Sequence, residues 1–451
     1  MLVTLMLVTL LVMILLGVPI ALALAGSSLF FLVVGNLTGG VTTPAITVIH
    51  RMVNGVDSFP LLAVPFFIMA GNLMNSAGIT KQIYDFAVAA VGWLKGGLGH
   101  VNVAGSVIFA GMSGTAVADA GGLGTIEIKA MRDHGYDTGF AVGLTAASST
   151  IGPIIPPSLP LVIYGVVANA SISALFVAGI VPGLIMAVVL SASVAFYAHR
   201  HGIGRDARFQ MRVLGVSFVH AFLPLLTPVI IIGGMSFGLF TPTEAAVFAC
   251  AYALLLSLVV HRVFNWILLA RGRPMGYSVL TMRQLVRVTM DTIETTAVVL
   301  LIVAGASIFG WILTTTRTTD ALGAWILEFA ADPVTFLILV NVFLLLVGCF
   351  METIAAITIL TPVLLPVAVK LGIDPVHFGL IMVLNLMIGL LTPPVGMVLY
   401  VLARVSKLSF EETVRAVAPW LVPLLLVLAL ITFVPETVLW LPRTLKELGY
   451  L

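Results

Sequence analysis

The sequence predicts an all-α, polytopic membrane protein built from two structural repeats. Of its 451 residues, 60% are hydrophobic and only 9% are charged. A soluble protein keeps about a quarter of its residues charged, so the outer surface of this chain must face lipid. Apolar runs of about 20 residues, the length that crosses a bilayer core as a helix, recur along the whole chain. Two of these runs are interrupted by the same Gly and Pro pattern, which predicts a duplication.

The uninterrupted apolar stretches predict roughly eleven to twelve crossing helices. They lie near residues 2–16, 18–35, 60–76, 83–94, 101–118, 172–198, 216–240, 243–264, 295–314, 321–331, 334–350, 353–370 and 417–440. The start of the chain has no basic segment and no cleavage site before Pro19, so we expect a retained first span rather than a signal peptide. No segment is long and polar enough to form a soluble domain. We therefore expect one integral-membrane domain over residues 1–451.

Two further stretches, 139–168 and 377–403, contain Gly and Pro pairs and predict re-entrant helix–turn–helix hairpins. The pair Gly152 and Pro157 recurs as Gly389 and Pro394, and both separations equal 237 residues (389 − 152 and 394 − 157). We expect a first repeat of about 1–198 and a second of about 216–440, each with a broken helix and a hairpin. Secondary transporters are commonly built from inverted repeats of this kind, and we expect inversion here.

Two arginine-rich loops are separated by two apolar spans, so both lie on one face of the membrane. Positive charge predicts that this face is cytoplasmic. The arginines are Arg200, Arg205, Arg208 and Arg212 in one loop, and Arg262, Arg271, Arg273, Arg283 and Arg287 in the other. The segment 281–294 mixes apolar and charged residues, which is typical of an interfacial amphipathic helix or of a solvated loop with a short surface helix.

The broken helices and the hairpin tips are the candidate functional segments. Glycine and hydroxyl residues at 111–119 weaken a membrane helix, and prolines in the tips 152–157 and 389–394 leave carbonyl groups without helical partners. Free carbonyls and hydroxyls suit a hard cation such as Na⁺, and a helix that starts after a tip directs its positive end at an anionic group. The candidate substrate-binding residues beside the tips are Ser148, Ser149, Thr150 and Asn385.

Each of these residues also has a structural interpretation. Ser, Thr and Gly in membrane helices are more often packing or interhelical hydrogen-bonding groups than ligands. Glu352 is an ionisable residue in an apolar stretch, which indicates either a functional site or a cap on the helix that begins at Thr353. The run Thr241-Pro242-Thr243-Glu244 predicts a capping box. Residues in charged stretches are expected in loops or at helix ends, among them Asp57, Glu127, Lys129, Arg132 and Asp133.

Several function classes are excluded or disfavoured by the same sequence. The eight histidines show no metal-ligand spacing, and no Walker A pattern occurs, so ATP bound to this chain does not supply energy. The net charge of +2 favours no nucleic-acid partner. We therefore expect a transporter and not an enzyme. A non-transporting membrane scaffold is a weaker hypothesis, because a scaffold has no need for two broken helices.

The sequence resembles the large membrane subunit of tripartite ATP-independent periplasmic (TRAP) transporters, the DctM-like subunit. The run 57–71 (DSFPLLAVPFFIMAG) carries the resemblance, together with GMSG at 111–114, PPS at 156–158, TPTEA at 241–245 and LTPPVG at 391–396. These motifs extend over nearly the whole chain. The resemblance implies import of an organic acid across the bacterial inner membrane, driven by a sodium gradient through an elevator-type movement of the hairpin-bearing part.

The resemblance also implies two sodium sites and two protein partners. The first site would involve Ser113, Thr115, Gly152, Ile155 and Pro157, and the second Gly348, Glu352, Thr353, Gly389, Thr392 and Pro394, many of them through backbone carbonyls. The partners would be a small four-helix membrane subunit and a periplasmic substrate-binding protein. Since this chain begins at the large subunit's first span, we expect the small subunit on a separate polypeptide. The alternative is a stand-alone sodium/dicarboxylate symporter of the divalent-anion type.

Overall fold

The computed structural model describes residues 2–270, 277–330 and 332–449, apart from the side chains of Leu15, Ser113 and Asp320. Within these ranges the chain forms helices and one isolated β-bridge, so the all-α prediction is confirmed. Two arginines of the second predicted basic loop, Arg271 and Arg273, lie outside the described residues.

The helices of the first half lead into a hairpin and then a long helix. They are α1 (Leu2–Leu15), α2 (Ile20–Leu37), α3 (Thr47–Val56), η1 (Phe59–Leu62), α4 (Ala63–Ser76), α5 (Ile79–Val91), α6 (Gly97–Ser113), α7 (Ala116–Gly121), α8 (Leu123–Asp133), α9 (Thr138–Ser149), α10 (Leu159–Ala168) and α11 (Ile172–Arg200). Helices α9 and α10 are the two arms of the first predicted hairpin, and the break between them falls at residues 150–158.

Four helices lead from the first half to the second, which also contains a broken helix and a hairpin. They are α12 (Met211–Ser236), α13 (Pro242–Leu255) with η2 (Leu256–Val260) and α14 (His261–Ala270), and α15 (Met282–Thr315). The others are α16 (Thr318–Phe329), α17 (Pro333–Gly348), α18 (Thr353–Lys370), α19 (Pro375–Gly389), α20 (Met397–Ser406), α21 (Phe410–Phe433) and α22 (Glu436–Glu447). Helices α19 and α20 form the second hairpin, with its break at residues 390–396.

In the described ranges eight helices are long and apolar enough to cross a membrane, and one bent pair would add a ninth. The eight are Ile20–Leu37, Phe59–Ser76, Ile172–Arg200, Met211–Ser236, Pro242–Ala270, Met282–Thr315, Thr353–Lys370 and Phe410–Phe433. This is fewer than the roughly eleven to twelve expected. The difference arises because several expected spans form helices of fewer than 18 residues, among them α1, α5 and α6, with 14, 13 and 17 residues.

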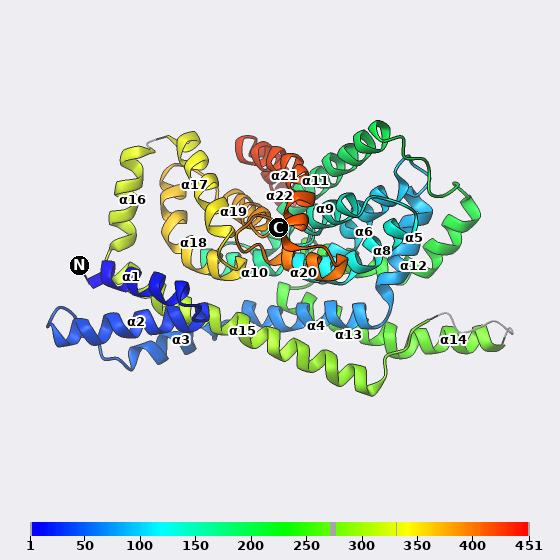
Figure 1. The fold of residues 1–451 in the computed structure, drawn as a ribbon. Coiled ribbons are helices and arrows are strands. Elements are labelled where there is room, and N and C mark those ends of the chain that lie inside the picture. Colours follow the sequence, from blue (N-terminus) through cyan, green and yellow to red (C-terminus); the bar gives the residue numbers. More distant parts are fainter. Residues whose placement is uncertain (1, 271–276, 331, 450–451) are drawn as a thin grey trace.

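An elongated layer of helices lies along one side of the molecule (Figure 1). Its longest member is α15, which packs against α2, α3 and α4, while α13 packs against α4. Helix α15 begins with a capping box between Thr281 and Gln284. The segment 281–294 is therefore neither a separate interfacial helix nor a loop, because it is the first part of this 34-residue helix. The predicted capping box between Thr241 and Glu244 is present at the start of α13.

The hairpins occupy the centre of the molecule, above this layer (Figure 1). Every residue of α9 from Phe140 to Ser149 is buried, and so is every residue of α19 from His377 to Gly389. A helix that is apolar all round is stable where it is enclosed by other helices. The first arm of each hairpin therefore forms part of the core.

The two halves agree in their helix bounds at the predicted offset. The pair α7 and α8 extends from 116 to 133 and α18 from 353 to 370, so both ends differ by 237 residues (353 − 116 and 370 − 133). The caps agree too, since Asp137 caps α9 and Asp374 caps α19. The second arm of each hairpin packs against a helix of the other half: α10 packs against α18, and α20 packs against α7. Each hairpin thus contacts the broken helix of the other half.

Candidate functional site

The first helix break contacts the tip of the first hairpin. Helix α6 ends at Ser113, Gly114 follows with a left-handed φ of 60°, and Thr115 caps α7 by accepting a hydrogen bond from the Ala118 N–H at 3.3 Å. A Cβ atom added to Gly114 would lie 2.5 Å from the Pro157 carbonyl oxygen, so only glycine permits this approach. The structure therefore brings Thr115 and Pro157, two predicted ligands, to the same place.

The second break contacts the second tip even more closely. A Cβ atom added to Gly389 would lie 2.5 Å from the Gly348 Cα atom, which means that the two backbones touch. The Val395 N–H donates to the Cys349 carbonyl at 3.2 Å. The Thr392 Oγ1 lies 3.0 Å from the Cys349 Sγ and donates to the Gly389 carbonyl at 2.7 Å. Gly348, Gly389 and Thr392 therefore form one cluster.

Other predicted ligands lie further from these contacts. Ile155 packs on α11, because a Cβ atom added to Gly183 would lie 2.2 Å from its Cγ1. The Gly152 N–H donates to the Ser149 carbonyl at 3.3 Å. Thr353 is buried, and its hydroxyl has no hydrogen-bond partner within the described chain. The tips differ in exposure: residues 150–158 are all buried, whereas Pro394 is exposed.

The predicted substrate-binding residues lie in buried hydrogen-bonding networks. Ser148, Ser149, Thr150 and Asn385 are completely buried. The Ser148 hydroxyl donates to the Asn102 Oδ1 at 2.7 Å, and the Asn385 Nδ2 donates to the Asn341 Oδ1 at 2.6 Å. Ser149 and Thr150 donate to backbone carbonyls of their own helix. At equivalent positions, Ser148 and Asn385 thus join the first arm of each hairpin to the helix before the break, an arrangement that supports the packing interpretation.

Glu127 does not lie in a loop or at an exposed helix end, as the sequence had suggested. It faces inward from α8 with an exposed fraction of 1%, and its Oε2 accepts a hydrogen bond from the Asn102 Nδ2 at 2.6 Å. Asp119, on α7, is 2% exposed. The signal in the sequence was periodicity, because Leu123, Glu127 and Met131 recur every four residues and share the buried face of α8.

A cavity of about 510 Å³ lies where the two breaks meet the elongated layer. It is bounded by both halves and by helices α4 and α15. The residues that line it include Thr115, Ala118 and Leu159 from the first half, Glu352, Ile354 and Met397 from the second, Asn72 and Asn75 from α4, and Glu294 and Thr295 from α15. The first residues of α10, α18 and α20 lie at or beside this cavity.

The lining of this cavity suits both an anion and a cation. Helix N-termini carry partial positive charge and unpaired N–H groups, which favour an anionic ligand. The carboxylates of Glu294 and Glu352 favour a cation beside it. The capping role predicted for Glu352 is confirmed, since its side chain accepts a hydrogen bond from the Ala355 N–H at 3.1 Å. Glu352 also lines the cavity, and its role as a functional residue stays a prediction.

Sequence reasoning missed the contribution of α4 and α15. Asn72 and Asn75 are three residues apart in an otherwise apolar helix, so they share a face, and this spacing was the available signal. The Asn72 Nδ2 donates to the Thr292 hydroxyl at 3.2 Å and so joins α4 to α15. The Thr80 hydroxyl donates to the Asn75 Oδ1 at 3.0 Å. The polar face of α4 is thereby fixed toward the cavity.

Comparisons with known proteins give a consistent result. The family described as "Tripartite ATP-independent periplasmic transporter, DctM component" matches residues 7–437. The chain is 47% identical over 434 residues to the sialic acid TRAP transporter large permease protein of Vibrio cholerae, covering 96% of both chains. It is 36% identical over 389 residues to the C4-dicarboxylate TRAP transporter large permease protein of Pseudomonas aeruginosa, covering 86% of this chain and 87% of that one.

A solved structure shares the fold. The Alcanivorax borkumensis YdaH transporter aligns with a TM-score of 0.54 at 15% sequence identity, covering 87% of this chain and 88% of that one. Two helix breaks, two hairpins and a cavity with two carboxylates therefore occur in a chain that matches transporter permeases over residues 7–437. The chain belongs to the DctM family of TRAP transporter large permeases, and it is a multi-pass inner-membrane transporter subunit rather than an enzyme.

Proposed function

We propose that this chain is the large permease of a sodium-coupled importer of an organic acid, supplied by a periplasmic binding protein and assembled with a small membrane subunit. The observation that carries the proposal is the cavity between the two helix breaks. It combines the N-termini of α10, α18 and α20 with the carboxylate of Glu352. The partial positive charge of the helix N-termini complements an organic anion, and the carboxylate complements a cation that moves with it.

The coupling ion is assigned to the contacts between breaks and tips. The Pro157 carbonyl lies against Gly114, the Gly348 carbonyl lies against Gly389, and the Thr392 hydroxyl donates to the Gly389 carbonyl in the second cluster. Oxygen ligands of this type suit a hard cation. Two equivalent clusters support two sodium sites, which differ in their side chains because Thr115 and Glu352 occupy equivalent positions (352 − 115 = 237).

The substrate class follows from relatives and from the cavity together. The relative in Vibrio cholerae is named for sialic acid and the one in Pseudomonas aeruginosa for C4-dicarboxylates, and both substrates carry carboxylates. Sialic acid is the first substrate to test, because identity is 47% in the first case and 36% in the second. We further propose an elevator movement, in which α9, α10, α19 and α20 move relative to α4 and α15. The unequal exposure of the two tips is the state expected when one side is open.

The test is uptake into proteoliposomes that contain the purified chain, the small membrane subunit and the binding protein. We expect accumulation of sialic acid when an inward sodium gradient is imposed. Uptake that is unchanged after replacement of sodium by potassium would refute the coupling. Omission of the binding protein separates the two hypotheses, since a stand-alone sodium/dicarboxylate symporter would transport without it.

A further inference from the structure

Two connecting segments of the chain are held together by backbone hydrogen bonds. One is the turn 92–96 between α5 and α6, and the other is the loop 201–210 between α11 and α12. The Gly96 N–H donates to the Gly204 carbonyl at 2.9 Å, and the Ala207 N–H donates to the Gly92 carbonyl at 3.1 Å. Lys95 and Arg205 form an antiparallel bridge. The loop is therefore an ordered platform, although it contains no helix.

Asp206 fixes this platform to its surroundings. Its Oδ2 accepts hydrogen bonds from the Leu98 N–H at 2.9 Å and from the Tyr136 hydroxyl. Burial raises the pKa of the Tyr136 phenol, and the hydrogen bond to Asp206 raises it further, so the phenol remains a donor at neutral pH. The negative charge of Asp206 is thus already engaged by donors of the protein.

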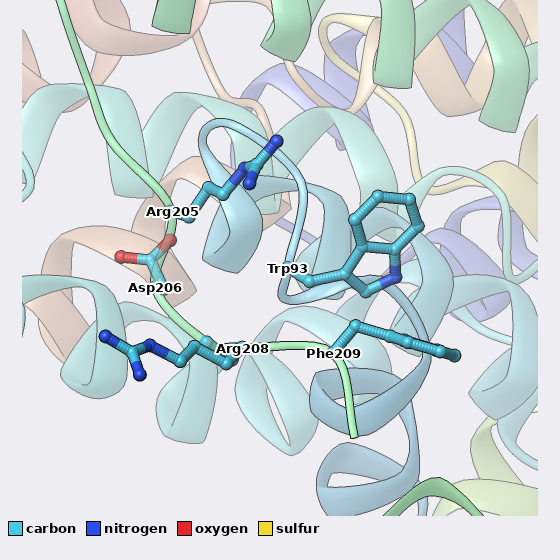
Figure 2. Close-up of a pocket in the computed structure, with 6 residues that line it drawn as sticks. Trp93, Arg205, Asp206, Arg208 and Phe209 are labelled. Carbon is cyan, nitrogen blue, oxygen red and sulfur yellow. The ribbon is translucent and has the colours of Figure 1, made fainter. Parts of the chain in front are cut away.

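A cavity of about 580 Å³ opens on the platform, lined by Trp93, Arg205, Asp206, Ala207, Arg208 and Phe209 (Figure 2). Arg205 and Arg208 extend from the loop on the two sides of Asp206, and the rings of Trp93 and Phe209 lie together on the other side of the cavity (Figure 2). The rings meet edge to face, with centroids 5.7 Å apart. In the described part of the chain neither guanidinium forms an ion pair with a carboxylate.

The position of the cavity places it at the boundary of the bilayer. The loop joins the ends of two candidate spans, Ile172–Arg200 and Met211–Ser236. Apolar side chains on both sides of it are exposed, including Phe196 at 68% and Met211 at 72%. Such side chains face lipid in a membrane protein. Aromatic rings beside cations are typical of the headgroup level, and the basic loops predict the cytoplasmic leaflet, which carries anionic lipid.

We propose that this cavity binds the phosphate group of an anionic phospholipid through Arg205 or Arg208, each of which can turn toward it, with Trp93 and Phe209 against the glycerol and first methylene groups. A single guanidinium can bind two phosphate oxygens at once, and a second nearby adds favourable charge. Free phosphate shares this chemistry, but the two rings and the exposed apolar surface around the loop favour a lipid. The proposal is independent of the transported substrate.

The test measures lipid retention by native mass spectrometry of the purified full chain. Phosphatidylglycerol is titrated against phosphatidylcholine, and the double variant Arg205→Gln/Arg208→Gln is compared with the control Arg262→Gln/Arg287→Gln. The control removes the same charge from exposed positions of the other basic region. At about 1 kcal/mol for each hydrogen-bonding contact to the phosphate that is lost from the cavity, we expect phosphatidylglycerol binding to weaken ~10- to 30-fold in the first variant. The control should bind like the wild type.

Equal retention of phosphatidylglycerol by both double variants would overturn the proposal. Equal binding of phosphatidylglycerol and phosphatidylcholine by the wild type would do the same. Full displacement of phosphatidylglycerol by millimolar inorganic phosphate would assign the site to free phosphate and overturn the lipid assignment. Thermal unfolding of the two variants shows whether they fold alike. Should the Arg205→Gln/Arg208→Gln variant unfold, the single variant Arg208→Gln is judged by the same criteria.

Discussion

The contact between Gly348 and Gly389 gives the sharpest mutational prediction. The change Gly389→Ala adds one methyl group to the second hairpin. In the structure that atom would lie 2.5 Å from the Gly348 Cα, 2.6 Å from its carbonyl carbon and 3.0 Å from its oxygen. All three are backbone atoms, so no side chain can rotate away. Ordinary contact begins near 3.4 Å, and the hairpin must therefore move from the break by about 0.9 Å (3.4 − 2.5).

A shift of this size is large for an ion site. Ligand distances in metal sites are set to within about 0.2 Å, and a misplacement of about 1 Å costs on the order of 100-fold in a positioned site. We therefore expect Gly389→Ala to weaken sodium binding ~100-fold. The matched control is Gly215→Ala on α12, where an added Cβ meets nothing within 4 Å.

The assay is thermal unfolding of the purified chain in detergent, with sodium chloride or choline chloride. A ligand that binds the folded state raises the unfolding midpoint according to its concentration relative to Kd. Wild type and Gly215→Ala should be stabilised by sodium, and Gly389→Ala should respond equally to both salts. A normal sodium response in Gly389→Ala would refute the assignment of an ion to this contact.

Further substitutions at three places separate ligand roles from structural ones. Glu352→Ala and Glu352→Ser both remove the carboxylate and should weaken sodium activation of uptake, but serine retains an N-cap oxygen, so only alanine should lower the free energy of unfolding, by about 1 kcal/mol. Normal sodium activation in the serine variant would leave Glu352 only its capping role. Thr392→Ala and Ser113→Ala should each reduce sodium activation more than protein abundance, and equal losses in both measurements would favour packing. Asn385→Leu removes the hydrogen bond between the side-chain amides of Asn385 and Asn341, and should lower the free energy of unfolding by about 1–3 kcal/mol in denaturant titrations. An unchanged unfolding transition would show that this hydrogen bond contributes no stability.

The breaks between the hairpin arms were accessible from the sequence because glycine and proline act locally. Pro156-Pro157 and Pro393-Pro394 cannot continue a helix, and the breaks at 150–158 and 390–396 fall where these residues occur. Capping is local in the same way, so Thr241 with Glu244 was read correctly. A motif of a few neighbouring residues was enough to predict each helix break and the capping box.

The candidate site was less accessible because its parts come together only by packing. Asn72 and Thr115 line one cavity, although α5 and α6 lie between them in the chain. Glu127 was assigned to a helix end because its neighbours Lys129 and Arg132 are charged, yet its own face of α8 is apolar. The end of α6 at Ser113 falls within the break predicted from the glycine and hydroxyl residues at 111–119, although the apolar stretch itself was expected to continue to 118.

The most direct test of the account is a pair of experimental structures of the chain, determined in sodium and in choline. We predict density for an ion between Gly348, Gly389 and Thr392, and a second between Gly114 and Pro157, present in sodium and absent in choline. Identical maps in the two salts, with both break–tip contacts empty and unchanged, would contradict the claim that these contacts bind the coupling ion.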